Sequence, residues 1–586
     1  MTKADRYLGH EICDILSEGY KDVNPRPKYS DGTPAHTISI NQVMRKYDLS
    51  KGEFPICTLR PMAWKTAIRE VMAIFINQSN KGSELERMGI AWWKPWYMED
   101  GTIGKSYPYN LESHRPNEAK KLVKKVERRY VNKKYANLKP VPVFDGLPSV
   151  DGIVYLNRYK NVGINEELTD EKHTYYNIQF INNNYITTIR KDSLGKSKGI
   201  NPYERTTYGI GYLDLYNVVN NFTEEEITIL KDKWENMFRR CYSKAYLKEH
   251  PTYKNTFVHQ DWHSFKQFLE DVRYLPQYFL AKEDGFKGWD LDKDYYGSNA
   301  YSKDTCVFLK HSENTLYSRV KGCYKIIDEN TQKEYYEINL SDFARSIDEP
   351  QQTVQKAVTK HKKFKNFLFE YMYNNGQYVY RYELSRNQVN ELIKDIQENP
   401  YGRRHIISFW NWANIQEKSL VECAYETLWN VRGEYLDMTL IQRSGDMLTA
   451  SGAGGMNEIQ YAALLMMIAR HTGYKAGVFC HFVQNEQIYD RHEEQAMEIF
   501  SRFKKLLVHE EDETIRPELV LNPEKNNFYD FTIEDFTLLD YEPIRPQLKL
   551  DAFHIGMNCT IFLNLWIFLT FFSDNNVGSI RKWFLR

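Results

Sequence analysis

The alternation of apolar and polar positions is clearest in the C-terminal third of the chain. Tyr425, Thr427 and Trp429 alternate with their neighbours, and so do Leu436, Met438 and Leu440. Residues 432–434, Arg-Gly-Glu, lie between the two runs and can form a turn. This pattern predicts a β-hairpin with one buried face.

Helical spacing marks other segments of the two ends of the chain. Residues 64–77 place apolar side chains at helical intervals, and residues 457–472 form a long apolar run closed by Gly473. We expect a helix in each segment, and further helices over residues 5–19 and 388–397. Residues 478–492 predict a strand followed by a polar loop.

The pattern changes between residues 112 and 386. Residues 112–140 carry many more Lys and Arg than Glu, which predicts a basic helix. Such a helix suits phosphate contacts, but a solvated linker helix fits equally well. Residues 141–220 are β-rich, with a hairpin expected over 175–189. Residues 340–361 predict two short helices, with Ser341 capping the first and Pro350 at the turn, a helix-turn-helix spacing.

These changes predict a domain organisation. Residues 1–111 and 387–551 form one domain, interrupted by an insert over residues 112–386; such a graft is tolerated when its ends lie close together. The insert divides into the segments 112–140, 141–220, 221–320 and 330–372. The length alone, 586 residues, predicts about three or four domains.

The remaining segment, 552–586, is a hydrophobic tail. Its uncharged run over residues 559–572 is short for a membrane span of about 20 residues. We expect a docked or unstructured tail and no membrane partner. The charged start of the chain does not resemble a signal peptide, so a cytoplasmic location is expected, in the host cell if the gene belongs to a phage.

Composition narrows the function classes. The formal net charge is zero, so any contact with nucleic acid must be local. The eight cysteines lie far apart and form no C-x-x-C pair, which argues against a zinc ribbon or a dithiol redox site. A reducing compartment fits this usage.

Candidate chemistry centres on Cys423. The predicted hairpin returns residues 442–444, Gln-Arg-Ser, to the start of its first strand. A thiol facing an arginine and a hydroxyl suits a covalent nucleophile beside an anion site. A buried cysteine in a β core remains the alternative.

Two further features leave alternatives open. Glu70 lies between apolar neighbours, as either a solvated edge residue or a functional buried carboxylate. Trp92, Trp93 and Trp96 could fill a core or form a stacking wall for a flat ring.

The two ends of the chain resemble the thymidylate synthase family. The resemblance rests on several motifs in order along the chain: DGTPAHT from Asp31, WKTAIRE from Trp64, EDGTIG from Glu99, RRHI from Arg403, the cysteine of LVEC, QRSGD from Gln442, NEIQYA from Asn457, IYDRH from Ile488 and FYDFTIEDF from Phe528. The resemblance implies an α/β (α+β) fold with a large twisted mixed sheet and helices. It also implies a homodimer that packs sheet against sheet.

Site residues follow from the same resemblance. The catalytic set that it implies is Cys423, Glu70, Tyr489 and Asp446. The substrate-binding set is Arg403, Arg404, Gln442, Arg443, Ser444, Asn457, Gln487 and Tyr489. Trp93 and Asp446 would contact folate, and no residue of this set is expected to bind a metal.

The implied roles are specific. Cys423 adds to C6 of deoxyuridylate (dUMP), and Arg443 and Ser444 hold its phosphate, joined by Arg403 and Arg404 of the neighbouring subunit. Asn457 reads the uracil edge, Tyr489 binds the deoxyribose hydroxyl, and Glu70 organises proton transfer. The reaction is reductive methylation to thymidylate with 5,10-methylenetetrahydrofolate. Deoxyuridylate hydroxymethylase, in which water attacks the exocyclic methylene, is the alternative on this scaffold.

Some positions depart from the family pattern. Glu422 replaces the usual proline before the cysteine, and its negative charge would raise the thiol pKa. Gln487 replaces a histidine. The chain also continues past Asp551, where the family closes its site with a short C-terminal segment, so the tail could hinder closure.

The insert resembles homing endonucleases of the HNH group. The carrying residues are NPYERTTYGIGY from Asn201, WENMFRRCY from Trp234, LDKD from Leu291, YSKDTCVF from Tyr301 and the predicted helix-turn-helix. Lys293 stands where many HNH members have a histidine, which leaves Asp292, Asn314 and His311 for a divalent metal. DNA is therefore an expected partner, and DNA cleavage stays open.

Overall fold

The protein is represented by a computed structural model. It describes residues 1–25, 27–29, 31–112, 120–124, 130–145, 162–169, 173–180, 182–193, 201–319, 322–360, 363–373, 378–382, 384–508, 516–550 and 553–554. Below, the outer part means the described residues of 1–112 and 387–550, and the middle unit means residues 201–319.

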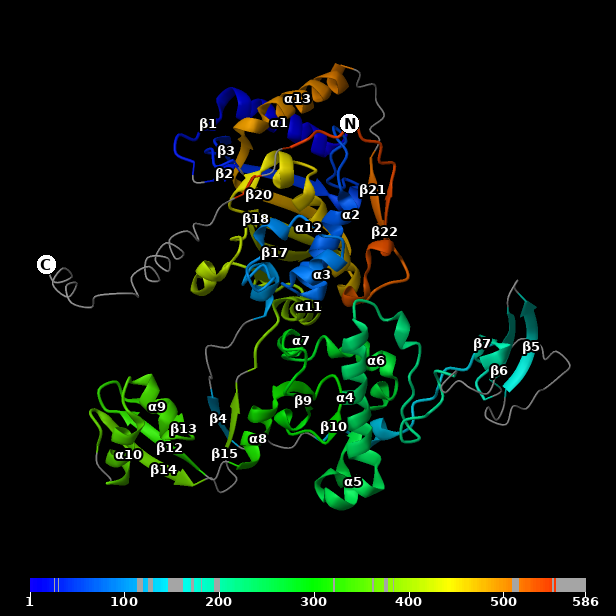
Figure 1. The fold of residues 1–586 in the computed structure, drawn as a ribbon, viewed down its shortest axis with the longest axis vertical. Coiled ribbons are helices and arrows are strands. Elements are labelled where there is room, and N and C mark those ends of the chain that lie inside the picture. Colours follow the sequence, from blue (N-terminus) through cyan, green and yellow to red (C-terminus); the bar gives the residue numbers. More distant parts are fainter. Residues whose placement is uncertain are drawn as a thin grey trace, which may run out of the picture.

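A mixed seven-stranded sheet forms the centre of the outer part (Figure 1). Its strands run in the order β1 (Tyr20–Lys21), β3 (Thr37–Asp48), β20 (Lys475–Tyr489), β18 (Tyr435–Gln442), β17 (Ala424–Arg432) and β16 (Ile406–Ser408), with β19 (Gly445–Asp446) beside β20. β18 and β19 pair with β20 in parallel, and the other pairs of this sheet are antiparallel. The mixed α/β class expected from the sequence is therefore present.

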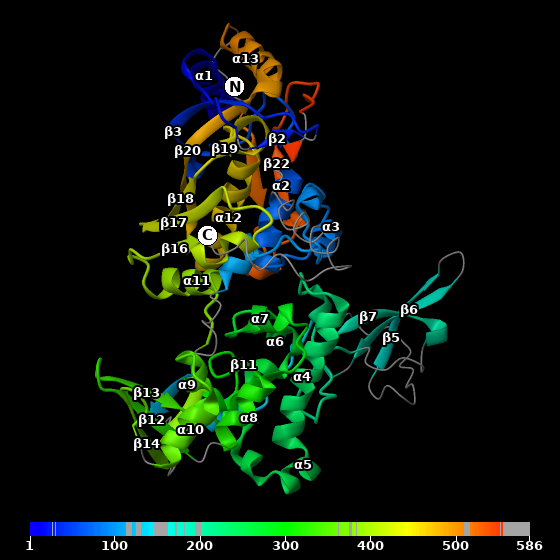
Figure 2. The ribbon, with the colours of Figure 1, turned by 60° about the vertical axis from the view of Figure 1, so that its left-hand side comes forward.

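Helices cover one face of this sheet. Figure 2 shows α12 (Met456–Thr472) and α2 (Trp64–Met72) on the same side of it. The other helices of the outer part are α1 (Lys3–Glu18), α3 (Gly82–Arg87), α11 (Gln388–Glu398) and α13 (Glu493–Val508). The predicted helix over residues 64–77 ends in a π-helical turn, Ala73–Asn77, and Gly473 closes α12 at φ +82° as predicted.

The predicted hairpin is confirmed. β17 and β18 pair in antiparallel register from Ala424 opposite Gln442 to Arg432 opposite Tyr435. Gly433 adopts φ +62° in the turn, a conformation that glycine takes without steric cost. The hairpin therefore brings residue 442 back beside residue 424.

The chain leaves and re-enters the outer part at one place. Glu112 and Asn387 form an isolated antiparallel bridge, and the Asn387 side-chain amide donates to Glu112 Oε2 at 2.9 Å. Ser385 Oγ donates to the other carboxylate oxygen at 2.5 Å. This closeness supports, as a proposal, an insert with junctions near residues 112 and 387.

The middle unit is built from helices around short strand pairs. Its helices are α4 (Glu224–Tyr242), α5 (Lys244–Glu249), α6 (Phe265–Val272), α7 (Tyr278–Glu283) and α8 (His311–Arg319). Its strands pair as β8 (Phe257–Val258) with β10 (Ala300–Tyr301), and β9 (Trp289–Asp292) with β11 (Val307–Lys310). Apolar residues such as Trp234 and Phe268 belong to one hydrophobic cluster with the core of the outer part.

Arg273 holds the middle unit against the outer part. Its buried guanidinium donates to the carbonyl oxygens of Tyr529 at 2.7 Å, Asn220 at 2.8 Å and Asn221 at 2.6 Å. Tyr529 belongs to the outer part, and the other two carbonyls belong to the middle unit. Lys282 adds a second link, because its ammonium donates to the Asn77 carbonyl at 3.1 Å.

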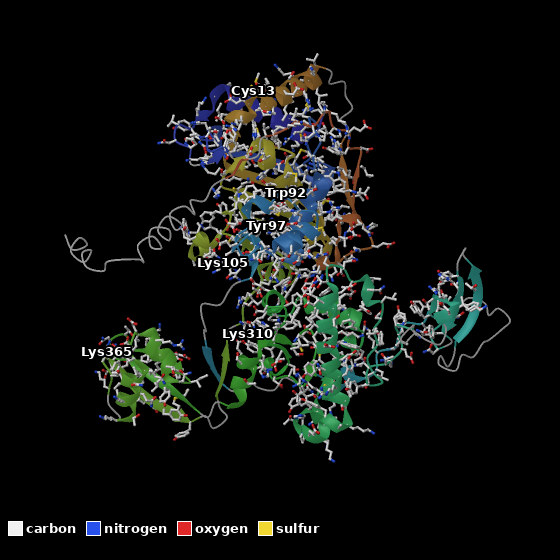
Figure 3. All side chains as sticks on the ribbon, viewed as in Figure 1. Cys13, Trp92, Tyr97, Lys105, Lys310 and Lys365 are labelled. Carbon is white, nitrogen blue, oxygen red and sulfur yellow. The ribbon has the colours of Figure 1, made fainter. Side chains whose placement is uncertain are left out.

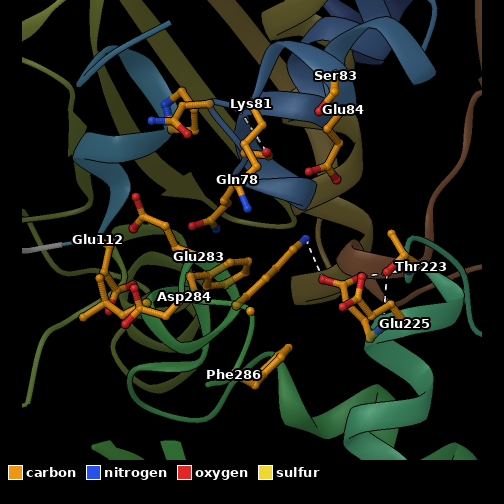
Figure 4. Close-up of a pocket in the computed structure, with 18 of the residues that line it drawn as sticks. Gln78, Lys81, Ser83, Glu84, Glu112, Thr223, Glu225, Glu283, Asp284 and Phe286 are labelled. Atoms are coloured by element: carbon orange, nitrogen blue, oxygen red, sulfur yellow. Dashed lines mark hydrogen bonds and ion pairs between the residues drawn. The ribbon is translucent and has the colours of Figure 1, made fainter. Parts of the chain in front are cut away.

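A cavity of about 680 Å³ lies beside this second link (Figure 4). Gln78, Glu84 and Glu112 line it from the outer part, and Glu283 lines it from α7. Lys282 Nζ lies 3.3 Å from Glu226 Oε1 within it. The outer part and the middle unit contact each other around this cavity and line it from opposite sides.

The described residues on either side of the middle unit form small sheets. β5 (Val162–Thr169), β6 (Thr174–Phe180) and β7 (Ile186–Arg190) form one sheet, and the β6–β7 pair confirms the predicted hairpin. β12 (Gly322–Asp328), β13 (Lys333–Glu337) and β14 (Phe367–Tyr373) form another, on which α9 (Leu340–Ser346) and α10 (Gln351–Thr359) pack. The two short helices are thus confirmed, but Asn339 caps the first, not Ser341, because its side chain lies one residue before the helix and accepts the Ser341 and Asp342 amides.

The predicted basic helix over residues 112–140 is wrong where the structure describes it. Residues Lys120–Lys124 form β4, which pairs with β15 (Tyr378–Tyr382), and Lys133–Ala136 form a short 3₁₀ turn. β15 is rich in tyrosine and valine, which favour strands, so a partner distant in sequence overrides the local pattern. Residues 113–119 and 125–129 lie outside the described residues.

The C-terminal segment returns to the outer part. β21 (Glu518–Leu521) pairs with β22 (Phe536–Leu539), and β2 (Lys28–Tyr29) pairs with β23 (Phe553–His554). The expectations for the tail concern residues 552–586, which apart from β23 lie outside the described residues. Within the described ranges, no helix has the length and apolar character to cross a membrane.

Candidate active site

A cavity of about 500 Å³ opens beside the start of β17 in the outer part. Predicted site residues from distant parts of the sequence line it together: Glu70, Trp93, Cys423, Gln442, Ser444, Asp446 and Asn457. The N-terminal residues reach it on α2 and the loop after α3, and the others reach it from the β17–β18 hairpin, the segment that follows it and α12. The fold therefore brings these seven residues together, and their roles stay predictions.

Cys423 is half-buried at the edge of the cavity. Its backbone N–H donates to the Tyr107 hydroxyl at 3.3 Å, and its carbonyl accepts the Arg443 N–H at 2.9 Å. Arg443 Nη2 lies 3.7 Å from the sulfur and also donates to the Val421 carbonyl at 3.0 Å. The predicted juxtaposition of thiol and arginine is confirmed, and a nearby cation favours a thiolate.

Glu422 lies buried beside the cysteine, but its charge is compensated. Lys418 Nζ lies 2.6 Å from its Oε2, and its Oε1 accepts the Tyr107 N–H at 2.9 Å and an Asn110 amide N–H at 3.1 Å. The expectation that this carboxylate raises the thiol pKa left out the lysine. With Lys418 paired to it, Glu422 is a structural carboxylate that ties residues 107–110 to the segment before β17.

Glu70 is a buried carboxyl group, so it is not a solvated residue at the edge of its helix. Trp93 Nε1 donates to its Oε1 at 2.6 Å, and Gln460 Nε2 donates to its Oε2 at 2.6 Å. Burial raises the pKa of this carboxyl group above its usual range. Its proton can therefore be held and released nearer to neutral pH than that of a solvated glutamate.

The tryptophans form one wall of the cavity. Trp93 is buried, while Trp96 and the more exposed Trp92 also line the space. Trp92 lies in the outer part, on the other side of the interface from Lys310 of the middle unit (Figure 3). The Trp93 and Trp96 rings meet edge to face at 68°, so the wall offers aromatic faces against which a ring can stack.

Asn457 is linked to Glu70 through a residue that the sequence reasoning missed. Its side-chain amide donates to Gln460 Oε1 at 3.1 Å, and Gln460 in turn donates to Glu70. Asn457 and Gln460 lie three residues apart in α12, a spacing that places them on one face of the helix. That spacing, within the motif NEIQ, was the signal that could have identified Gln460.

Asp446 and Ser444 line the cavity from the segment that follows β18. Asp446 accepts the Leu448 N–H at 3.2 Å and a hydrogen bond from the Thr449 hydroxyl, and burial raises the pKa of this carboxyl group. The Ser444 carbonyl accepts the Gln442 side-chain amide at 2.9 Å. These contacts fix the loop that follows β18.

Other predicted residues do not line the cavity. Arg403 and Arg404 are exposed in the turn before β16. Tyr489 is buried at the end of β20, and Gln487 Nε2 donates to its hydroxyl at 3.4 Å. Arg443 lies beside Cys423 and does not line the cavity either. The roles assigned to these residues, like those of the cavity residues, stay predictions.

Arg60 is a cavity residue that no pattern in the sequence singles out. It is buried, its Nη2 donates to the Leu448 carbonyl, and burial lowers its pKa. Gln547 and Leu550, from the C-terminal segment, line the same cavity, so that segment does reach the site. Gln547 Nε2 is held by the Pro61 carbonyl at 2.7 Å.

The metal expected in the insert has no adequate ligand set in the described residues, where no three His, Cys, Asp or Glu side chains gather to hold an ion. The antiparallel pair β9–β11 followed by α8 does bring Asp290 to His311 Nδ1 at 2.9 Å and to Asn314 Nδ2 at 3.1 Å. Asp292, however, is buried and accepts the Tyr295 N–H at 2.7 Å. The described residues therefore give no support for the expected metal, and no step through a metal is derived.

Comparison with known proteins adds family information. A family model described as thymidylate synthase matches residues 6–136 and 307–553. Thymidylate synthase of Streptococcus pneumoniae (strain ATCC 700669 / Spain 23F-1) is 46% identical over 169 residues, 28% of this chain and 57% of its own length. The enzyme of Streptococcus mutans is 47% identical over the same shares. The alignment thus spans little more than half of these relatives.

Among solved structures, thermostable thymidylate synthase A from Bacillus subtilis aligns over 94% of this chain and 99% of its own, with 19% identity and a TM-score of 0.43. The two matched segments of the family model together cover more than half of the sequence and leave residues 137–306 between them. The chain belongs to the thymidylate synthase family.

Proposed function

We propose that this protein methylates deoxyuridylate to thymidylate, with 5,10-methylenetetrahydrofolate as co-substrate and dihydrofolate as second product. The observation that carries this proposal is the cavity that gathers Cys423, Glu70 and Asn457, with Arg443 at 3.7 Å from the sulfur. Family membership supports the same reaction.

Cys423 is the proposed nucleophile. Its thiolate adds to C6 of the uracil ring, which turns C5 into a carbon nucleophile; covalent addition thereby divides a difficult substitution into easier steps. The guanidinium of Arg443 stabilises the thiolate before attack. Arg443 and Ser444 also present donors suited to the substrate phosphate.

Asn457 is proposed to bind the uracil edge, and Glu70 is proposed to transfer protons. The carboxamide of Asn457 can accept from uracil N3 and donate to O4, which matches the uracil edge. Glu70, with its raised pKa, holds or accepts a proton near C5 and O4 through water. Folate supplies the carbon and the hydride, and the protein supplies orientation and charge.

The tryptophan wall favours methylation over hydroxymethylation. Trp93 and Trp96 line the cavity with Leu420 and Leu550, so the space for folate is largely apolar. An apolar wall excludes the water that would have to attack the exocyclic methylene. Methyl transfer is therefore the reaction proposed here.

A homodimer is proposed through the outer face of the sheet. Met44, Ile441 and Phe482 lie on the face opposite α12 and are exposed or half-exposed. An apolar sheet face of this kind is stabilised by packing against a second sheet. In such a dimer the exposed Arg403 and Arg404 would be available to the partner's substrate phosphate.

Product analysis tests the proposed reaction. Purified protein is incubated with deoxyuridylate and 5,10-methylenetetrahydrofolate, and the nucleotides are separated and weighed by mass spectrometry. We expect thymidylate and an equal amount of dihydrofolate. Hydroxymethyldeoxyuridylate without dihydrofolate, or unchanged substrate, would contradict the proposal.

DNA binding through the insert is a second proposed activity, supported by α10. This helix buries Val354 against α9 and exposes a polar face: Gln351, Gln352, Gln355, Lys356 and Thr359. Glutamine side chains can read adenine in the major groove, and lysine binds phosphate. Fluorescence anisotropy with duplex DNA should show binding that Lys356→Ala weakens and that added salt reduces. Equal binding by Lys356→Ala would argue against α10 as the contact.

A further inference from the structure

Gln442 connects the catalytic cavity to a buried group of charges behind it. At the centre of this group, Arg45 of β3 is completely buried. Its guanidinium donates to both carboxylate oxygens of Glu11, at 2.7 and 2.6 Å, to Glu486 at 3.1 Å and to Glu458 at 3.3 Å. These carboxylates come from α1, β20 and α12, so three elements meet at one arginine.

His481 is the link between this group and Gln442. Its Nδ1 lies 3.0 Å from Glu458 Oε1, and its Nε2 lies 3.1 Å from Gln442 Oε1. Arg45 Nη1 also faces the ring, 3.4 Å from Nδ1. In the β18–β20 pair, His481 lies opposite Leu440, which is two residues before the end of β18.

The contacts determine where one ring proton lies. Gln442 Nε2 donates to the Ser444 carbonyl at 2.9 Å, so the amide oxygen of Gln442 must face the ring. An amide oxygen only accepts, and so does the Glu458 carboxylate on the other side. Nε2 therefore carries hydrogen and donates to Gln442, while Nδ1 faces both the Glu458 carboxylate and the Arg45 guanidinium.

The surrounding groups hold the ring in place. Glu458 faces both Arg45 Nη1 and the ring, and the Tyr47 hydroxyl donates to Glu458 at 2.7 Å. Glu11 and Glu486 face Arg45. Burial lowers the pKa of His481, and the hydrogen bond to Glu458 opposes that shift. A neutral ring that carries its hydrogen on Nε2 keeps the bond to Gln442.

We propose that His481 is a positioning residue for the reaction proposed above: it holds the amide oxygen of Gln442, which keeps the Gln442 NH₂ on the Ser444 carbonyl and the loop 442–444 set for the substrate phosphate. Without the Nε2–H donor, the Gln442 amide loses the contact that fixes its orientation. His481 touches no substrate and acts only through Gln442.

Two substitutions separate the contact of Nδ1 with Glu458 from the contact of Nε2 with Gln442. The amide of His481→Asn reaches the place of Nδ1, so it keeps Glu458 and loses Gln442. The amide of His481→Gln reaches the place of Nε2 and keeps Gln442. We expect KM for deoxyuridylate to rise roughly tenfold in His481→Asn, as for the loss of one hydrogen bond, and to stay near the wild-type value in His481→Gln. Equal KM values in the two variants would overturn the proposal.

A matched control removes a different contact of the same carboxylate. Tyr47→Phe deletes the hydroxyl that donates to Glu458 and leaves the ring in place, so it should lower thermal stability without changing KM. Adding His481→Asn to Gln442→Leu should change KM by less than about twofold, because the residue that it positions is already gone. A full tenfold effect in that background would show a general structural role and overturn the proposal.

A further readout does not depend on turnover. A crystal structure of His481→Gln should keep Gln442 Nε2 on the Ser444 carbonyl, as in the wild type, and loss of that contact would overturn the proposal. In His481→Asn the contact should be lost, and an unchanged Gln442 orientation there would also overturn it. If the wild type makes no thymidylate, the proposed function fails, and the orientation of Gln442 in these structures still tests the inference.

Discussion

Lys418 and Glu422 form a buried ion pair, with Nζ and Oε2 2.6 Å apart, one residue before the thiol of Cys423. The lysine lies four residues before the carboxylate along the chain. The pair explains how a negative charge is tolerated directly beside a proposed thiolate.

Removing the lysine should therefore affect both stability and thiol reactivity. In Lys418→Met the Glu422 charge is buried without its counter-ion, which costs about 3–5 kcal/mol of unfolding free energy. The unpaired charge should also shift alkylation of Cys423 by iodoacetamide to higher pH. Urea unfolding and alkylation rates measure the two effects. Lys418→Met/Glu422→Gln should recover most of both; no recovery would mean that Lys418 acts through other contacts.

Glu70 is expected to act in proton transfer. Glu70→Gln keeps the size of the side chain and a carbonyl oxygen for Trp93, but it cannot exchange a proton. We expect kcat to fall by at least about 100-fold, while calorimetric affinity for deoxyuridylate changes little. A loss of affinity with unchanged kcat would instead make Glu70 a binding residue.

Glu486 should make stability depend on pH. Burial raises the pKa of this carboxyl group from 4.5 to about 7, so the folded state keeps a proton that the unfolded state loses between these values. Its contribution is present below pH 4.5 and is lost as the pH rises through 7, by about 3 kcal/mol in total. Glu486→Gln should flatten this part of the curve of unfolding free energy against pH. An unchanged curve would show that another group carries the dependence.

Arg273 should determine whether the middle unit stays attached. Arg273→Ala removes the three hydrogen bonds from this buried guanidinium to carbonyl oxygens, and we expect a loss of about 3 kcal/mol. Calorimetry should then show separate transitions for the outer part and the middle unit. Arg239→Ala, at an exposed position on α4, is the matched control and should leave a single transition unchanged.

Local patterns in the sequence account for much of this site. The β17–β18 hairpin follows from alternation and one glycine, and it places Arg443 beside Cys423 without any distant contact. The helix that carries Asn457 follows from its apolar spacing. The family motifs then assigned the residues that line the cavity.

Contacts between distant segments were beyond the local pattern. β4 is a strand because residues 378–382 pair with it, and nothing near residue 120 indicates that partner. The contact of His481 with Gln442 depends on the register of two parallel strands. Arg60 reaches the cavity from a loop with no periodicity. In each case the determining neighbour lies far away in sequence.

Tritium release from 5-tritiated deoxyuridylate tests the role of Cys423 most directly. The label leaves C5 only after a nucleophile has added to C6 and the carbon unit has been attached. With 5,10-methylenetetrahydrofolate, the wild type should release tritium in step with dihydrofolate formation, and Cys423→Ser should release none above background while keeping its fold and its affinity for deoxyuridylate. Tritium release at the wild-type rate by Cys423→Ser would contradict the assignment of this thiol as the nucleophile.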